Sequence, residues 1–223
     1  MGGLSKKIDI PCLWYPTISQ LLNNELSLQD VVSENKSKFR AKLIKEPNLA
    51  FVTQQLNDVF PEAKLVFVVR DPFSNMKSIL DRLGLSAGFR LEDKIETFPS
   101  SWAHVFDNQL WRFPCCDPTL MLAHRWKLVA KNALSISGNV MHVSYSDFQA
   151  DKLGCLRRIS QNLGISEVNN VAKRLNVKYQ PGGNHKVSIG EFFGTKIIDR
   201  ITEICEPEFS QLGYQVLKST RRE

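Results

Sequence analysis

Apolar residues are spaced in two different ways along this chain. Between residues 17 and 38 they recur every three or four positions, which predicts one or two amphipathic helices. Residues 64–69 (KLVFVV) form instead a continuous apolar run, which is typical of a strand covered on both faces in a parallel sheet. Two shorter segments, 41–47 (AKLIKEP) and 140–145 (VMHVSY), are also predicted to be strands, and Pro47 would end the first.

Helices are predicted between and after these strands. Helical spacing of apolar residues covers 48–60, 74–83, 119–138, 151–164 and 195–209. Residues 84–118 show no clear period and are rich in Phe, Trp and Pro, so we interpret them as an insertion. Strands that alternate with helices predict an α/β fold with a mainly parallel sheet, in a single domain over residues 1–223 that begins with a helical segment at 1–40.

Composition narrows the class of function only a little. Hydrophobic residues make up 43% of the chain and charged residues 23%, as in ordinary globular proteins. The net charge of +6 favours an anionic ligand, but no run of Lys or Arg suggests a nucleic acid as partner. The five cysteines lack metal-ligand spacing, so no metal is expected. The first residues do not have the pattern of a signal peptide, and no apolar stretch reaches about 20 residues, so no membrane span is expected. The compartment stays open: the chain as written would be cytoplasmic.

A polar corner follows the strand predicted at 64–69. Arg70 stands at the carboxyl end of that strand, where open parallel sheets bind their ligands. Asp71 is suited to cap the next helix and Pro72 to its first turn, while Ser74 and Ser78 would share one helical face. A guanidinium with hydroxyls beside it predicts a phosphate site. The alternative is that Arg70 pairs with Asp71 or another acid and that Ser78 only packs.

This corner carries a family resemblance. The segment FPEAKLVFVVRDPFSNMKS (60–78) closely resembles the 3′-phosphate-binding segment of the sulfotransferases that use 3′-phosphoadenosine 5′-phosphosulfate (PAPS). Three other segments resemble the same family: LIKEPN (43–48), RWKLVAKNAL (125–134) and EFSQLGY (208–214). The family's Tyr-Glu-Asp-Leu-like turn is similar to residues 145–148, although Ser146 replaces the usual Glu. The resemblance runs from about residue 41 to 214 and is closer to the tyrosylprotein and carbohydrate branch than to the small-phenol enzymes.

The resemblance implies a fold and a nucleotide site. The fold would be three-layered and similar to that of P-loop NTPases, with helices on both sides of a mainly parallel sheet. PAPS would be the co-substrate, and a sulfonate group would pass from it to a hydroxyl or amine acceptor. Arg70 and Ser78 would hold the 3′-phosphate, Lys186 from a late glycine-rich loop would reach the same phosphate, and Tyr145 would lie near the adenine. A buried core role for Tyr145 is an equally good interpretation.

The resemblance also implies two catalytic residues. Lys45 would stabilise the bridging oxygen or the sulfonate, and Glu46 would deprotonate the acceptor. Because adjacent strand residues face opposite ways, only one of the two should reach the cleft. The alternative for Lys45 is a solvated lysine at the edge of the sheet.

One element of the family is not found in the sequence. The family's Pro-(Lys/Arg)-Ser-Gly-Thr-Thr loop, which holds the 5′-phosphosulfate, has no counterpart before Ala41, so the first strand-loop-helix unit would be lacking. Three explanations are open: a truncated active enzyme, which would allow a Golgi location, an inactive relative, or a homo-oligomer in which another subunit supplies the loop. The rival functions are a non-catalytic nucleotide-binding relative and a P-loop kinase-like phosphotransferase.

Overall fold

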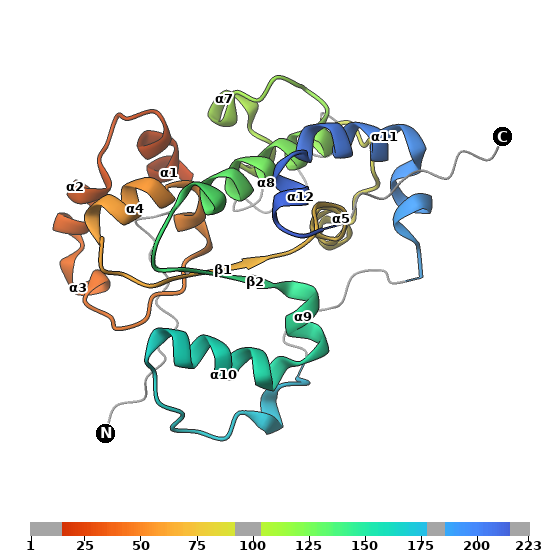
Figure 1. Ribbon diagram of the computed structural model, residues 1–223. Coiled ribbons are helices and arrows are strands. Elements are labelled where there is room, and N and C mark those ends of the chain that lie inside the picture. The colour runs from red at the N-terminus through yellow and green to blue at the C-terminus, as the bar shows by residue number, and fades with distance from the viewer. Residues whose placement is uncertain (1–14, 92–103, 178–185, 215–223) are drawn as a thin grey trace. The chain divides into compact units, whose positions relative to one another are not determined.

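The chain divides into two compact units in the computed structural model, which describes residues 15–91, 104–177 and 186–214 (Figure 1). The N-terminal unit comprises residues 1–63 with 132–138, and the sheet unit comprises residues 64–131 with 139–223. The second unit contains the polar corner, and the first contains Lys45 and Glu46.

The described part of the N-terminal unit is helical. Its elements are α1 (Tyr15–Leu22), α2 (Leu28–Glu34), α3 (Lys36–Phe39), the 3-10 helix η2 (Pro47–Phe51) and α4 (Thr53–Val59). Apolar residues at helical spacing are buried on these elements, among them Ile18, Leu21, Leu28, Val31 and Leu56. The helical character predicted for residues 17–38 is therefore confirmed, but the segment forms three short helices where one or two were predicted.

The prediction of a strand at 41–47 is wrong. These residues are irregular up to Glu46, whose side chain accepts a hydrogen bond from the backbone N–H of Asn48 and so caps η2. Leu43 is 49% exposed, so the apolar side chains of this segment do not line a buried sheet face. A strand also needs a neighbour to pair with, and none is present among the described residues of this unit. The helix predicted at 48–60 likewise begins as η2 and becomes α-helical only at Thr53.

The sheet unit is built on two parallel strands. Strand β1 (Leu65–Val69) pairs with β2 (Val140–Ser144) in a register that sets Leu65 opposite Val140 and Val69 opposite Ser144. The helices are α5 (Pro72–Leu83), α7 (Asn108–Trp111), α8 (Pro118–Ser135), α9 (Tyr145–Ala150), α10 (Lys152–Leu163), α11 (Ile189–Cys205) and α12 (Glu208–Gln211), with the 3-10 helices η4 (His104–Phe106) and η5 (Ala172–Arg174). The α/β class with a parallel sheet is confirmed, and the sheet is small.

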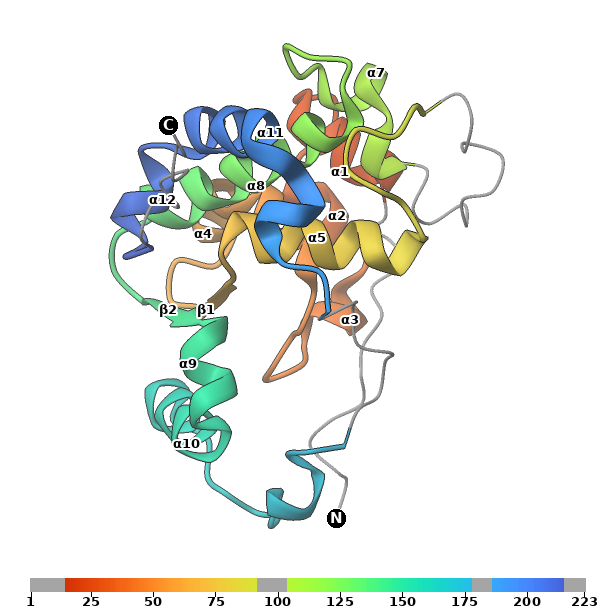
Figure 2. The same cartoon turned by 90° about the vertical axis from the view of Figure 1, so that its right-hand side faces the viewer.

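Helices lie on both sides of this strand pair. Figures 1 and 2 show α5, α8, α11 and α12 on one side and α10 on the other. Because α10 packs against β2, it leaves part of β1 uncovered, and Val68 is 60% exposed. The prediction that residues 64–69 are covered on both faces is therefore wrong for the described chain.

Aromatic packing holds the C-terminal helices on α5. The Phe73 ring of α5 is 6.4 Å from the Phe193 ring of α11 and 6.1 Å from the Phe209 ring of α12, both edge-on. All three rings are at most 4% exposed. Since these rings come from elements far apart in the sequence, they fix α12 and the residues after it close to the end of β1.

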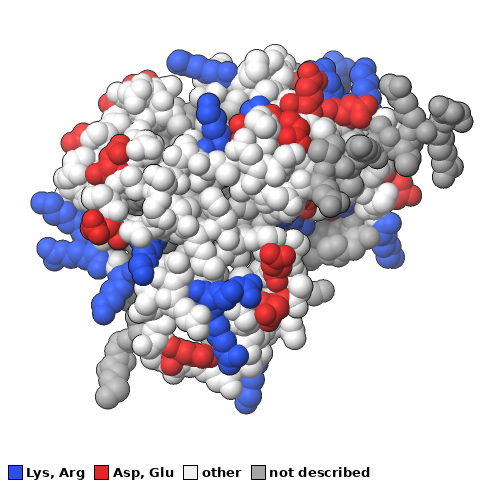
Figure 3. All heavy atoms as spheres, viewed as in Figure 1, with Lys and Arg blue, Asp and Glu red and all other residues white. Residues whose placement is uncertain are grey.

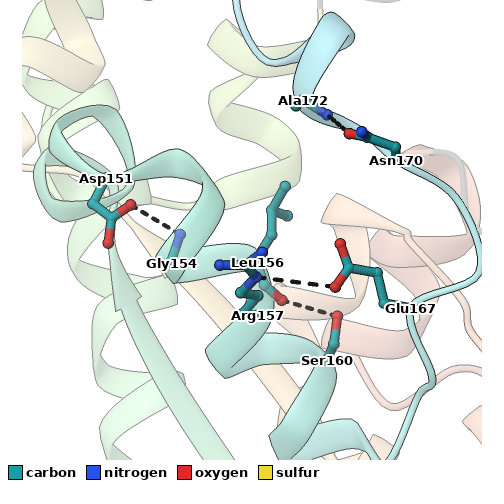
Figure 4. Close-up of polar contacts among 8 residues, drawn as sticks. All are labelled: Asp151, Gly154, Leu156, Arg157, Ser160, Glu167, Asn170 and Ala172. Atoms are coloured by element: carbon teal, nitrogen blue, oxygen red, sulfur yellow. Dashed lines mark hydrogen bonds and ion pairs between the residues drawn. The ribbon is translucent and has the colours of Figure 1, made fainter.

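The ends of the helices follow local sequence signals. Asp71 caps α5, Pro72 takes its first position, and Gly84 ends it with a φ of 67°. In the same way Asp151 caps α10 through the backbone N–H of Gly154, as Figure 4 shows. These caps confirm the roles expected for Asp71 and Pro72 at the polar corner.

Candidate functional site

The Arg70 side chain lies at the carboxyl ends of the two strands. Its guanidinium carbon is 4.9 Å from the centre of the Tyr145 ring, and Tyr145 is the first residue of α9, directly after β2. This distance is that of a cation–π contact. The structure thus brings together two of the residues that the sequence predicts for the nucleotide site.

Arg70 makes no ion pair with any residue of the described chain. The neighbouring carboxylate of Asp71 is occupied differently, because its Oδ1 accepts the backbone N–H of Ser74 at 2.8 Å. The pairing of Arg70 with Asp71 that the sequence left open is therefore not formed. A half-buried guanidinium with unused N–H donors is suited to bind an anion.

Two distant aromatic residues bind the backbone at this corner. The Tyr214 hydroxyl donates to the carbonyl of Val69, and Trp126 Nε1 of α8 donates to the carbonyl of Arg70, each at 2.9 Å. The carbonyls on both sides of the Arg70 Cα therefore each accept a hydrogen bond from a distant side chain.

Hydroxyl groups line the end of β2 next to Tyr214. The Ser144 and Ser146 hydroxyl oxygens lie 2.6 Å apart, and Ser144 also accepts the backbone N–H of Asp147. Burial, above all, raises the pKa of Tyr214 above its usual value, and the charges of Asp71 and Asp147 raise it further, whereas a hydrogen bond with Ser144 lowers it. The Tyr214 phenol therefore keeps its proton and remains a donor at neutral pH.

Ser78 lies further along α5 and is half-buried. Its hydroxyl forms no hydrogen bond with Arg70 or with any other described residue. At about 1.5 Å of rise per residue, Ser78 is some 9 Å along the helix from Pro72. The structure therefore does not join Arg70 to Ser78 directly, and their common binding of one phosphate stays a prediction.

Lys186 precedes the first turn of α11. It is exposed, and α11 begins three residues later, at Ile189, with a capping box between Ser188 and Glu191. Helix α11 packs against α5, partly through Lys77, whose Nζ is 2.8 Å from Asp81 and 4.9 Å from the Phe192 ring centre. Lys186 is thus attached to a helix that contacts the Ser78 helix, but no contact is seen between Lys186 and Arg70.

The two predicted catalytic residues lie in the N-terminal unit. Lys45 is exposed, and Glu46 Oε1 accepts the Asn48 N–H at 2.9 Å. Lys45 ends a basic segment, 36–45, that contains five cations and no acid. Figure 3 shows Lys and Arg side chains gathered over α3 and the chain that follows it. Because Lys45 is one of several cations in this segment and is exposed, the interpretation of Lys45 as a solvated lysine is favoured.

With this geometry in place, comparison with known proteins decides the family. A family model described as "Sulfotransferase family" matches residues 13–169, which is more than half of the chain. This chain belongs to the sulfotransferase family. No curated protein and no solved structure matches it.

The match divides the site residues of this sulfotransferase into two groups. Arg70, Ser78 and Tyr145 lie within the matched residues, as do Lys45 and Glu46. Lys186 and Tyr214 follow them in the chain, beyond residue 169. Part of the strand-end geometry therefore comes from a region that the family model does not match.

Sequence reasoning did not assign roles to Trp126 and Tyr214. Both occur in segments that resemble the family, RWKLVAKNAL and EFSQLGY. An aromatic donor within an apolar segment could have been expected to bind a buried carbonyl, because buried Tyr and Trp usually find a partner. Nothing in the local sequence indicates which carbonyl it binds.

A separate cavity lies within the segment interpreted as an insertion. It has a volume of about 840 Å³, and its lining includes Phe89, Arg90, His104, Asp107 and Met121. Arg70, Ser78, Tyr145 and Lys186 do not line it. The cavity and the strand-end site are therefore distinct features of the sheet unit.

Two kinds of feature are not found among the described residues. No group of His, Cys, Asp or Glu side chains is arranged to hold a metal ion in the part of the chain that the structure describes. None of the described helices is both long and apolar enough to cross a membrane.

Proposed function

We propose that this sulfotransferase binds PAPS at the carboxyl ends of β1 and β2 and transfers its sulfonate group to a hydroxyl or amine acceptor. The observation that carries this proposal is the Arg70 guanidinium, which stands at a strand end on the Tyr145 ring without an acidic partner among the described residues. Arg70 and Ser78 bind the 3′-phosphate, and Lys186 approaches the same phosphate from the start of α11.

Tyr145 has two roles in this proposal. Its ring faces the guanidinium and limits the directions in which Arg70 can point. The adenine base then lies near the same ring, since aromatic faces accept both bases and guanidinium groups. The contact leaves the in-plane N–H groups of Arg70 available for a phosphate.

Sulfonate transfer needs stabilisation of the charge that develops on the leaving phosphate. The acceptor oxygen or nitrogen attacks the sulfur while the bond from sulfur to the bridging phosphate oxygen breaks, and a base takes the acceptor proton. The resemblance to the family assigns Lys45 to the bridging oxygen or the sulfonate and Glu46 to the base.

In this proposal the segment 84–118, which supplies most of the lining of the cavity of about 840 Å³, shapes the acceptor site. Its volume is in the range of ordinary small-molecule sites. Its lining combines an apolar ring and thioether, from Phe89 and Met121, with the charged groups of Arg90 and Asp107.

A non-catalytic nucleotide-binding relative is the second candidate function. It is favoured by the Glu46 carboxylate, which is used as a helix cap. Such a protein would keep the Arg70 site without transferring sulfonate.

The deciding experiment measures nucleotide binding and transfer separately. Calorimetry should show binding of 3′-phosphoadenosine 5′-phosphate but not of ATP, and Arg70→Ala should abolish it. The control Arg157→Ala removes an exposed arginine of α10 that lies 3.9 Å from Glu167. This variant should bind 3′-phosphoadenosine 5′-phosphate as the wild type does. Preference for ATP would indicate a kinase-like phosphotransferase instead. Transfer of labelled sulfonate by the wild type, lost in Lys45→Ala, separates the enzyme from the non-catalytic relative.

A further inference from the structure

The Arg70 backbone is fixed by two hydrogen bonds from remote parts of the chain. Tyr214 is 145 residues from Val69, whose carbonyl it binds, and Trp126 is 56 residues from Arg70. Val69 is the last residue of β1, and Asp71 already has the φ and ψ of a helix cap, −55° and 145°. The chain leaves the sheet and enters α5 within these three residues.

A carbonyl oxygen has two lone pairs, and the hydrogen bonds of regular secondary structure at the end of a strand use at most one of them. An unsatisfied buried carbonyl is costly, so a side-chain donor that reaches it selects one orientation of the peptide group. Here the Tyr214 and Trp126 donors select the orientations of the two peptide planes that flank the Arg70 Cα. The direction of the Cα–Cβ bond of Arg70 follows from these two planes.

The two donors share a packed support. Phe209, which is 2% exposed, stacks on Tyr214 at 5.7 Å between ring centres and meets Trp126 edge-on at 6.3 Å. The same ring contacts Phe73 on α5. Tyr214 and Trp126 are therefore held by packing against Phe209 as well as by their hydrogen bonds to the Val69 and Arg70 carbonyls.

We infer that Tyr214 and Trp126 are positioning residues that set the preference of this site for nucleotides carrying a 3′-phosphate. This inference rests on the proposed function, because it assigns the 3′-phosphate to Arg70. An arginine side chain is flexible, so its aim at a phosphate depends on a fixed backbone and on the Tyr145 ring beneath it. Loosening the backbone weakens the contact with the 3′-phosphate and leaves the rest of the nucleotide unaffected.

The test compares two nucleotides that differ in the 3′-phosphate. Dissociation constants for 3′-phosphoadenosine 5′-phosphate and for adenosine 5′-phosphate are measured by calorimetry with the full chain. In Tyr214→Phe the ratio of the two affinities should fall about three- to tenfold, as expected for loss of one hydrogen bond, while binding of adenosine 5′-phosphate stays the same. Trp126→Phe should shift the ratio in the same direction.

A matched control is available in the same unit. Trp111 Nε1 donates to the carbonyl of His104 at 2.8 Å, which is the same kind of bond outside the strand-end site. Trp111→Phe should leave the affinity ratio unchanged. Tyr214→Phe is the deciding variant because it keeps the ring that stacks on Phe209 and removes a single oxygen atom.

Three results would overturn the inference, and they have different meanings. An unchanged affinity ratio in Tyr214→Phe shows that the hydrogen bond does not position Arg70. An equal loss for both nucleotides shows a purely structural role. If Arg70→Ala itself leaves the ratio unchanged, the proposed function fails and the inference fails with it. A lower ratio in Arg70→Ala with no change in Tyr214→Phe refutes the inference alone.

Discussion

Removal of the Asp71 carboxylate should destabilise α5 and weaken the nucleotide site together. In Asp71→Ala the backbone N–H of Ser74 loses the acceptor that now lies 2.8 Å away. Loss of an N-terminal cap costs about 1 kcal/mol, and loss of a negative charge at a helix N-terminus adds about 0.3–1 kcal/mol. We expect the free energy of unfolding to fall by about 1–2 kcal/mol, measured by urea titration followed by circular dichroism.

Two matched variants separate the contributions to this loss. Asp71→Asn keeps a good capping oxygen and removes only the charge, so it should cost at most about 1 kcal/mol. Asp151→Ala removes the corresponding cap of α10, a bond of 2.9 Å from the Gly154 N–H (Figure 4), and should cost about 1 kcal/mol as well. A loss in Asp71→Asn as large as in Asp71→Ala would refute the capping argument.

The same variants connect the cap to nucleotide binding. Helix α5 begins directly after Arg70 and carries Ser78, so fraying of its first turn changes how these side chains are presented. If binding must restore a turn worth about 1 kcal/mol, the affinity for 3′-phosphoadenosine 5′-phosphate falls about fivefold in Asp71→Ala. Asp151→Ala should bind normally. Equal weakening in both would show that only global stability matters.

Three further measurements test the packing around the site. Burial raises the pKa of Cys205 to about 12. Iodoacetamide at neutral pH should therefore modify the exposed Cys116 and spare Cys205 until the protein unfolds. Early modification of Cys205, seen by mass spectrometry, would contradict its burial. The Tyr214 pKa is raised in the folded state. The contribution of Tyr214 to stability is therefore present below the unfolded pKa of about 10 and is lost as the pH rises through the folded pKa. Above about pH 10, Tyr214→Phe should lose less stability than the wild type. Gly84→Ala places a side chain at a φ of 67° and should lower the free energy of unfolding by about 1–2 kcal/mol. Gly190 has neither a positive φ nor a close neighbour, so Gly190→Ala should be neutral or stabilising. Equal effects of the two variants would argue against strain at residue 84.

Local signals were sufficient for some elements of the fold. Helix α5 was expected at 74–83 and runs from Pro72 to Leu83, because a capping Asp, a Pro and a terminal Gly mark its ends within the sequence itself. Helix α10 was expected at 151–164 and spans Lys152–Leu163 for the same reason, with Gly164 at a φ of 68°. Caps and stops act within one helical turn, so they can be recognised without knowledge of the fold.

The segment 41–47 shows where such signals fail. A short apolar segment before a proline resembles a strand, but a strand exists only if another strand is available to pair with it. No partner is present among the described residues of the N-terminal unit, and Glu46 and Pro47 instead begin η2. The exposure of Val68 has a related cause, since α10 covers β2 and leaves this part of β1 open.

For the candidate site, the order of residues along the chain was enough to place Arg70 at a strand end, Asp71 at a helix cap and Tyr145 after the next strand. These assignments depend only on neighbouring residues and on the alternation of strands with helices. The side chain that Arg70 faces, and the Tyr214 and Trp126 donors that fix its backbone, depend on how α8, α12 and β1 pack around Phe209. Hydrogen bonds between residues 56 and 145 positions apart form only when packing brings their elements together, so no local pattern could have revealed them.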